Sequence, residues 1–361
     1  MNRRSFMSMS AGTALAGLGA GIVAGGAGAE TPRGPAHPLW PLWQSWTDAH
    51  LDFSGRVIDA PQRSASHSEG QGYGMLLAAE FGDSAAFDRM ADWTHTNLAI
   101  RGDNLLAWRW LPDTPERVPD LNNASDGDLF YAWALLRGSE VFGQTRWRSR
   151  AMDVVADLVR LCIASRPDRP GTPILLPAET GFVNDDRIVF NPSYIMPRAM
   201  RELASASGDV QLARAAESGL ALMEELAGQG LTPDWLELSA GGPRPAEGFS
   251  PHAGYEAIRV PLFLLWSGDY RHPAALRAAD AMSRAPEGRA GVVMDARTGE
   301  ILEYSQDAGY RAVAALTQCV AFDEVGSAIP PFAGNQPYYP ASLHLFTLLA
   351  QMEMFPACRP I

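Results

Sequence analysis

The 361-residue chain contains no lysine, so all 29 of its permanently basic side chains are arginine. With 41 acidic residues against these 29, the formal charge is −12, and so acidic a chain lacks the basic face that nucleic-acid phosphates require. Only 19% of the residues are charged, but 47% are hydrophobic, which is enough for a core and excludes wholesale disorder. Small molecules or neutral polymers are the partners that this composition favours.

Cysteine and histidine are also scarce. The three cysteines, Cys162, Cys319 and Cys358, lie far apart without CxxC spacing, so at most one disulfide can form and the fold does not depend on a disulfide framework. Cys162 ends a helical pattern of apolar residues, which predicts a buried thiol. The sequence has no HExxH motif and no cluster with metal-ligand spacing, so we expect neither a metal nor another cofactor. For His67, which lies beside a candidate site, we expect a structural role.

The N-terminal segment predicts export. Residues 2–7 (NRRSFM) resemble a twin-arginine motif, an Ala/Gly-rich stretch follows, and Ala27-Gly28-Ala29 fits an A-x-A cleavage site. Its apolar part is short, and no later stretch reaches 18 uninterrupted apolar residues, so we expect no membrane span in the mature chain. We therefore expect 1–29 to be a twin-arginine signal peptide and 30–361 to be one soluble domain, periplasmic or secreted.

After about residue 38 the sequence repeats a helical period followed by a loop rich in glycine, proline, asparagine and aspartate. Capping residues and apolar periodicity predict helices that begin at Ser84, at Asp126 or Asp128, at Asp209, at His272 and at Ser342. Two short hairpins are predicted, one pairing 174–176 with 187–190 and the other pairing 291–294 with 301–304. The prediction is therefore one all-α domain with long loops, and periodicity alone leaves a helical toroid, a solenoid and a large bundle open.

Three motifs hold carboxylates among small residues: SEGQGYGM at 68–75, NNASDGDL at 122–129 and GYEAIRVP at 254–261. The first places Glu69 beside three glycines in a loop before an apolar helix, where backbone and ligand can approach closely. In the second, Asp126 and Asp128 cannot both cap one helix, so one of them is free to face a groove. In the third, Glu256 and Arg259 are three residues apart, as in a helical ion pair. Each motif also has a purely structural interpretation, as a helix-end acid, a cap or a surface ion pair.

Aromatic residues recur in the loops between these motifs, within WRW at 108–110, NPSY at 191–194 and PDW at 233–235. Flat side chains in a groove suit carbohydrate, because sugar rings present apolar C–H faces that stack on them. Burial in the core is the alternative for such residues, and it accounts for several of the ten tryptophans.

Taken in order and spacing, five of these motifs resemble glycoside hydrolase family 8 over about residues 38–355. The resemblance implies an all-α (α/α)6 barrel and an endo-acting, inverting hydrolase of β-1,4-glucan. A bacterial cellulose synthase complex is the implied partner. Within the same family, chitosan, xylan and mixed-linkage glucan are alternative substrates.

The resemblance also implies roles for single residues. Glu69 falls on the general acid, Asp126 on the carboxylate that contacts the sugar at the cleavage point, and Arg259 on the arginine beside the base. The aromatic residues that match groove-lining positions are Trp108, Tyr194 and Trp235.

Residue 256 departs from the family pattern, which has aspartate as the general base where this chain has glutamate. Both side chains can accept a proton from water, but the extra methylene moves the carboxylate by about one C–C bond, and an error near 1 Å can lower a rate by about 10²-fold. We expect Glu256 to be the base, kept ionised by Arg259, with Asp126 in reserve. A polysaccharide-binding protein with lost turnover is the alternative from another functional class.

Overall fold

The computed structural model describes residues 32–361, so the signal peptide predicted for 1–29 lies outside the described residues. Within that range, none of the helices combines the length and the apolar character needed to cross a bilayer. The helices are α1 (Trp40–His50), α2 (Ser68–Phe81), α3 (Ser84–Asn97), α4 (Ser125–Phe142), α5 (Thr145–Cys162), α6 (Pro197–Ser207), α7 (Val210–Ala227), α8 (Val260–Trp266), α9 (Pro273–Met282), α10 (Ala308–Ala321) and α11 (Tyr338–Met354).

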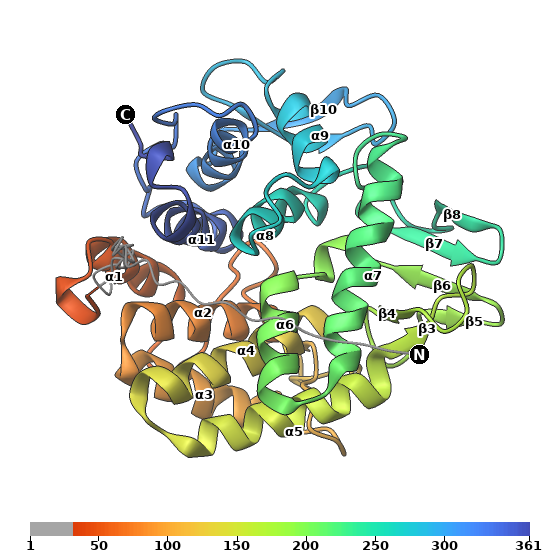
Figure 1. The fold of residues 1–361 in the computed structure, drawn as a ribbon. Coiled ribbons are helices and arrows are strands. Elements are labelled where there is room, and N and C mark those ends of the chain that lie inside the picture. The colour runs from red at the N-terminus through yellow and green to blue at the C-terminus, as the bar shows by residue number, and fades with distance from the viewer. Residues whose placement is uncertain (1–31) are drawn as a thin grey trace, which may run out of the picture. The chain divides into compact units, whose positions relative to one another are not determined.

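Six of these helices form a closed inner ring. Helices α2, α4, α6, α8, α10 and α11 each contact the next, and α11 contacts α2. Helices α1, α3, α5, α7 and α9 alternate with them along the chain and pack outside them (Figure 1). This alternation around a closed ring is the predicted (α/α)6 barrel. At the sixth outer position, between α10 and α11, residues 322–337 contain no helix.

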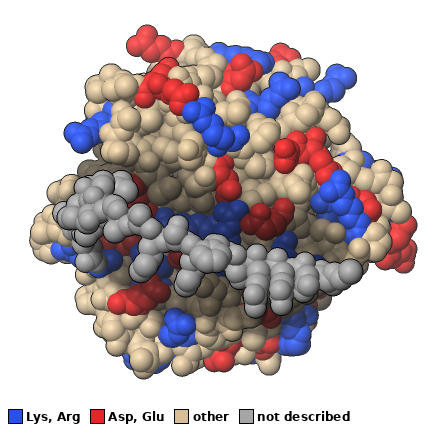
Figure 2. Space-filling model, viewed as in Figure 1, with Lys and Arg blue, Asp and Glu red and all other residues tan. Residues whose placement is uncertain are grey.

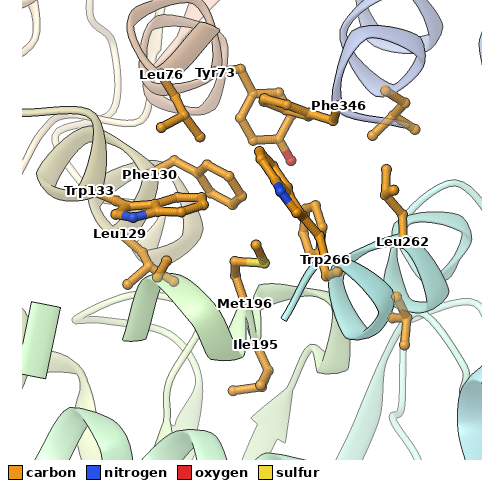
Figure 3. Close-up of a cluster of buried hydrophobic side chains, with 14 of the residues drawn as sticks. Tyr73, Leu76, Leu129, Phe130, Trp133, Ile195, Met196, Leu262, Trp266 and Phe346 are labelled. Carbon is orange, nitrogen blue, oxygen red and sulfur yellow. The ribbon is translucent and has the colours of Figure 1, made fainter. Parts of the chain in front are cut away.

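The centre of the ring is filled by large apolar side chains from α2, α4, α8 and α11, which point toward one another (Figure 3). The ring of Tyr73 lies 4.6 Å from that of Phe130 and 5.0 Å from that of Phe346, both edge to face. Trp133 and Trp266 meet at 5.5 Å in the same way. Because these helices bury nearly all of their faces, they carry little helical amphipathic signal and read as apolar runs in the sequence.

The capping signals located the predicted helices, but they did not always give the correct first residue. Asp209 caps α7 as predicted, with its carboxylate accepting the Gln211 N–H at 2.8 Å, and the helix ends at Gly228. Helix α3 is capped by Asp83, which accepts the Ala86 N–H at 3.0 Å, so the prediction of Ser84 as its cap is wrong by one residue.

The strands are short and lie in the loops: β1 (Ser66–His67), β2 (Arg109–Trp110), β3 (Ile163–Ser165), β4 (Pro173–Leu175), β5 (Val183–Asn184), β6 (Arg187–Phe190), β7 (Leu236–Ser239), β8 (Gly242–Pro245), β9 (Ala290–Met294) and β10 (Ile301–Ser305). The predicted hairpin at 291–294 and 301–304 is confirmed, because β9 pairs antiparallel with β10.

The other predicted hairpin is wrong. Strand β4 pairs with β3, and β6 lies between β5 and β7 in a four-stranded sheet, seen at the right of Figure 1. The reason is that β3 begins directly after α5, so its three residues look like a continuation of the helix. The four-stranded sheet positions part of the site described below.

The cysteines follow the sequence prediction. Cys162 is buried and free, and Asn123 donates a hydrogen bond to its sulfur. Cys319 and Cys358 form a disulfide that joins the end of α10 to the segment after α11. The bond therefore braces the part of the ring where residues 322–337 replace an outer helix.

Candidate active site

A close helix crossing between α2 and α4 brings two of the predicted site carboxylates together. Helices α2 and α4 begin side by side, and a Cβ added at Gly127 would lie 2.1 Å from Ser68 Oγ and 2.8 Å from Glu69 N. A Cβ at Gly72 would lie 2.9 Å from the backbone nitrogen of Tyr131. These glycines are therefore needed for close approach of two backbones. The prediction that SEGQGYGM is a loop is wrong, since helix α2 already begins at Ser68 and Glu69 stands in its first turn.

A single guanidinium binds all three predicted carboxylates. Arg259 Nη1 donates to Glu69 Oε2 at 2.6 Å, and Nη2 donates to Asp126 Oδ2 at 2.8 Å and to Glu256 Oε2 at 2.9 Å. Nη1 also donates to Tyr73 Oη at 2.7 Å. The arginine side chain is only 1% exposed and the Glu256 side chain is 36% exposed, so the guanidinium end of this pair is buried while the carboxylate end is partly open. Three segments far apart in sequence thus meet at one residue.

Ser193 lies beside both Glu256 and Arg259. Its hydroxyl lies 3.2 Å from Glu256 Oε2, while Arg259 Nη2 lies 3.0 Å from the same hydroxyl. Asn191 fixes the serine, because its Oδ1 accepts both the backbone N–H and the hydroxyl of Ser193. The NPSY motif therefore contributes a contact to the site through its serine as well as through Tyr194.

The electrostatics of the site favour a bound proton near neutral pH. Burial raises the pKa of Glu256 to about 7, with Arg259 opposing the shift and Asp126 and Glu69 adding to it. Burial also raises the pKa of Asp126, again against the pull of Arg259. Arg259 therefore favours the ionised form of Glu256, as expected, but one guanidinium shared by three carboxyl groups only partly offsets their burial and mutual repulsion.

Neither aspartate of NNASDGDL caps its helix. Helix α4 has Ala124 as its N-cap, without a side-chain cap hydrogen bond, and Asp126 is turned to Arg259. Asp128 is fully buried and accepts the Leu106 N–H and the Asn123 amide, each at 2.8 Å. Of the two, Asp126 lies at the candidate site and Asp128 anchors the neighbouring loop.

His67 has the contacts of a structural residue. Its Nδ1 accepts the Gly70 N–H at 3.2 Å and so caps α2, and its Nε2 lies 3.2 Å from Asp59 Oδ2. With Nδ1 accepting, the proton of the neutral ring belongs on Nε2, facing the aspartate. The histidine thereby fixes the helix end that carries Glu69.

The three predicted groove aromatics lie in different surroundings. Tyr194 is adjacent to the carboxylate cluster, with the Arg259 guanidinium carbon 5.5 Å from its ring centroid. Trp235 follows next, 6.1 Å from Tyr194, and belongs to a cluster with Phe182 and Phe249. Trp108 is half-buried and donates its indole N–H to Asp120 at 2.8 Å.

Sequence reasoning missed a set of tyrosines at the start of α11. Tyr338 Oη donates to Glu69 Oε1 at 3.2 Å, and Tyr339 Oη donates to the backbone oxygen of Tyr255 at 2.9 Å. A cavity of about 400 Å³ is lined by both tyrosines and by Glu69 and Glu256. The signal that could have found them is the pattern Pro-Tyr-Tyr-Pro at 337–340, two aromatics held at a helix N-terminus.

The charged side chains outside the site are mixed. Figure 2 shows acidic and basic groups interspersed on the visible face, with no single basic patch. In residues 32–361 no group of three or more His, Cys, Asp or Glu side chains is arranged to hold a metal ion. The chemistry available at the site is thus that of carboxyl groups around one arginine, beside a cavity lined in part by tyrosines.

Comparison with known proteins gives consistent results. The family model described as glycosyl hydrolases family 8 matches residues 35–353. A probable endoglucanase of Novacetimonas hansenii is 34% identical over 84% of this chain and 88% of its own length. The crystal structure of endoglucanase Cel10 of Klebsiella pneumoniae matches with a TM-score of 0.77 and 30% identity, over 86% of this chain and 99% of that one. The endo-β-1,4-glucanase CMCax of Acetobacter xylinum matches with a TM-score of 0.76 and 31% identity, over 87% and 98% of the two chains.

Proposed function

The chain belongs to glycosyl hydrolase family 8, and from that premise we propose that it is an endo-acting glycoside hydrolase that cleaves β-1,4-glucan. One observation carries the proposal: the buried guanidinium of Arg259 gathers Glu69, Asp126 and Glu256, and Glu69 and Glu256 line a cavity of about 400 Å³. A glycosidase of this type needs one carboxyl group to protonate the leaving oxygen and a second to act on the other face of the sugar.

Glu69 is our candidate for the general acid. It borders the cavity, and its two oxygens are held by different donors, Oε2 by Arg259 and Oε1 by the Tyr338 hydroxyl. The capped start of α2 and the close packing on α4 fix the backbone beneath it. A proton donor must be placed within hydrogen-bond reach of the glycosidic oxygen, and this rigid support serves that requirement.

Glu256 is our candidate for the general base, and water is the nucleophile that it activates, which gives inversion at the anomeric carbon. Its pKa of about 7 suits the task, because a base works best when its pKa lies near the working pH. Contacts with Ser193 and Arg259 hold the longer glutamate side chain at the cavity. These contacts are the reason to regard Glu256 as a base in an adapted site and not as a damaged one.

Asp126 is our candidate for binding the sugar at the cleavage point. Its Oδ2 is taken by Arg259 and its Oδ1 by the backbone N–H of Gly127, so it is held rigidly between the acid and the base. Tyr194, Trp235 and Trp108 would carry sugar rings along the groove by stacking against their C–H faces.

The first experiment presents the mature chain with carboxymethylcellulose, mixed-linkage glucan, xylan and chitosan. We expect new reducing ends from the first, a viscosity that falls before many ends appear, and the α-anomer as the initial product in proton NMR.

Glu69→Gln should lower kcat by roughly 10²–10⁴-fold while oligosaccharide binding remains, because the amide cannot donate as an acid. Glu202→Gln is the matched control, since Glu202 also pairs with an arginine but lies on α6 beside Trp133. If the wild type binds polysaccharide but releases no new reducing ends, the proposed hydrolase is refuted and the chain is a polysaccharide-binding protein.

A second set of variants tests the base. Glu256→Asp should lower kcat by about 10²-fold, because the shorter side chain is drawn away from Ser193 and from the water. Glu256→Ala should be nearly inactive. A rise in kcat for the aspartate variant would mean that Glu256 is a damaged base, and an alanine variant with wild-type turnover would transfer the role to Asp126 or another carboxylate.

We also propose that the domain works outside the cytoplasm, exported by the twin-arginine route and cleaved near Ala29, and that it serves a cellulose synthase complex. The motif at residues 2–7 and the disulfide between Cys319 and Cys358 support export, since disulfides persist in oxidising compartments. Arg3→Lys combined with Arg4→Lys should leave uncleaved precursor in the cytoplasm. Unchanged secretion would indicate a general secretory signal.

A further inference from the structure

Asp234 belongs to the PDW motif, and its contacts are to backbone groups. Its Oδ1 accepts the N–H of Gly254 and the N–H of Ala257, each at 2.8 Å. Its own N–H donates to the carbonyl of His252 at 2.9 Å. Three backbone groups of the segment 252–257, which carries Glu256, are therefore held by one residue.

These bonds replace the cap that Glu256 cannot provide. The chain turns helical at Glu256, which is followed by a single 3-10 turn over Ala257–Arg259 and then by α8, and Glu256 makes no side-chain cap hydrogen bond there. A helix start leaves backbone N–H groups without partners inside the helix. Asp234 accepts one of them from a distant part of the chain, which leaves the Glu256 carboxylate free to face Arg259 and the cavity.

The fit between Asp234 and this segment is tight. A Cβ added at Gly254 would lie 2.6 Å from Asp234 Oδ2, so only glycine allows the carboxylate to approach the loop this closely. Burial raises the pKa of Asp234, while the backbone donors of the loop act in the opposite direction. The backbone donors of the loop therefore offset part of the cost of burying this carboxylate.

The sheet explains why this anchor and Ser193 lie together. Strands β6 and β7 are antiparallel, with Phe190 opposite Leu236. The last residue of β6 and the first residue of β7 therefore lie at the same end of the sheet. Ser193 follows the first strand by three residues, and Asp234 precedes the second by two. One end of one sheet therefore places Ser193 beside the Glu256 side chain and, through Asp234, fixes the backbone on both sides of Glu256.

We propose that Asp234 is a positioning residue for the general base, holding the Gly254–Ala257 backbone so that the Glu256 carboxylate stays at the distance from the attacking water that turnover requires. This inference rests on the proposed function of Glu256. Trp235, the next residue, contacts the rings of Tyr194 and Phe249, so the same dipeptide links this aromatic cluster to the segment that carries the base.

The test compares Asp234→Ala, Asp234→Asn and a control, with kcat, KM, the pH profile on carboxymethylcellulose and the thermal midpoint measured for each. Asp234→Ala removes both acceptors, and we expect kcat to fall by about 10²-fold with KM within threefold of wild type, since the misplacement affects the reacting group. Asp234→Asn keeps an oxygen that can accept both N–H groups, so kcat should stay within about threefold of wild type. The acidic limb of its profile should also move to lower pH, because a negative charge near Glu256 is gone; the other charges acting there are Arg259, Asp126 and Glu69.

Asp295→Ala is the matched control. Asp295 also accepts two backbone N–H groups through one oxygen, from Arg297 at 3.0 Å and Thr298 at 2.8 Å, but in the β9–β10 turn. We expect it to lower the thermal midpoint without changing kcat. Amide exchange at Gly254 and Ala257 should accelerate in Asp234→Ala and remain slow in Asp234→Asn.

Two results would overturn the inference: an Asp234→Ala enzyme with kcat within threefold of wild type, or an Asp234→Asn enzyme that loses as much turnover as the alanine variant. Both require a wild-type enzyme that hydrolyses glucan. A wild type without turnover on any polysaccharide would instead refute the proposed function, which keeps the two failures apart.

Discussion

The glycine at position 127 allows a direct test of how the site is assembled. It stands between Asp126 and Asp128 at the start of α4, where the helix crosses the first turn of α2. Replacing it with alanine adds one methyl group at the contact that sets the spacing between Glu69 and Asp126. We expect Gly127→Ala to lower kcat strongly although it changes no group that touches substrate.

The structure gives the size of the effect. The new Cβ would lie 2.1 Å from Ser68 Oγ, 2.7 Å from Ser68 Cβ and 2.8 Å from Glu69 N. Carbon atoms prefer separations of about 3.5–4.0 Å, so the start of α2 must move by about 1 Å relative to α4. A misplacement of about 1 Å can lower a rate by about 10²-fold, and we expect that loss in kcat. Without a clash, alanine would instead stabilise a helix by about 1 kcal/mol relative to glycine.

The assay is kcat on carboxymethylcellulose together with the unfolding midpoint from calorimetry. Gly102→Ala serves as the control, because nothing lies within 4 Å of a Cβ at Gly102. Adding Ser68→Gly to Gly127→Ala removes the two Ser68 contacts and should restore part of the turnover, since the Ser68 hydroxyl has no hydrogen-bond partner among the described residues. A Gly127→Ala enzyme with kcat within threefold of wild type would refute the claim that this crossing sets the geometry of the acid.

Three further outcomes are expected. First, turnover should rise with pH through about 7 as Glu256 ionises, measured as log kcat/KM against pH; an acidic limb near pH 4.5 would contradict the raised pKa. Second, burial raises the pKa of Asp128 to about 7 from an ordinary value of 3.8. Its contribution to stability is therefore complete below pH 3.8 and is lost as pH rises through about 7, by up to about 4 kcal/mol. Urea unfolding from pH 4 to 8 should give a flatter slope for Asp128→Asn, and an unchanged slope would argue against the shift. Third, Cys319→Ser with Cys358→Ser opens a loop of 39 residues and should lower the unfolding free energy by roughly 4 kcal/mol in urea titrations; a loss below about 1 kcal/mol would show that 322–337 is held without the bond.

The residues of the candidate site could be named from the sequence because each stands inside its own local motif. The all-α class followed from the alternation of helical periods and loops, the (α/α)6 barrel followed from the family resemblance, and capping chemistry located α7. What could not be predicted is which of these residues bind one another. Arg259 is separated from Glu69 by 190 positions and from Asp126 by 133, so no local pattern records the cluster.

Glycine explains the main error at the site. A glycine-rich stretch is typical of a loop, because glycine adopts conformations that other residues avoid. In SEGQGYGM the same residue type serves a different purpose, removing side chains where two helices touch. The two uses leave the same letters in the sequence. The glycine of SDGD at 125–128 contacts the start of SEGQGYGM. This contact exists only in the tertiary structure and leaves no local pattern in the sequence.

The pairing of the short strands was predicted wrongly because their local sequence pattern is also ambiguous. Three residues are too few to show the alternation of a strand, so 163–165 reads as the end of α5, and its true partner at 173–175 is assigned to another segment. The hairpin at β9 and β10 was predicted correctly because its strands have five residues each and a turn-forming sequence between them.

The charge balance at Arg259 bears on how one site can hold both an acid and a base. Three carboxyl groups share this guanidinium, and it is the cation to which each of them is hydrogen-bonded. If all three were ionised the cluster would carry two uncompensated negative charges in a place that is largely withdrawn from water, which is why burial and repulsion raise the pKa values of Asp126 and Glu256. A proton is therefore retained in the cluster near neutral pH. Substrate that displaces water from the cavity strengthens the same effect. Because the arginine is one charge for three groups, it does not fully neutralise the carboxylates, and Glu256 changes its protonation state near neutral pH, as suits a base.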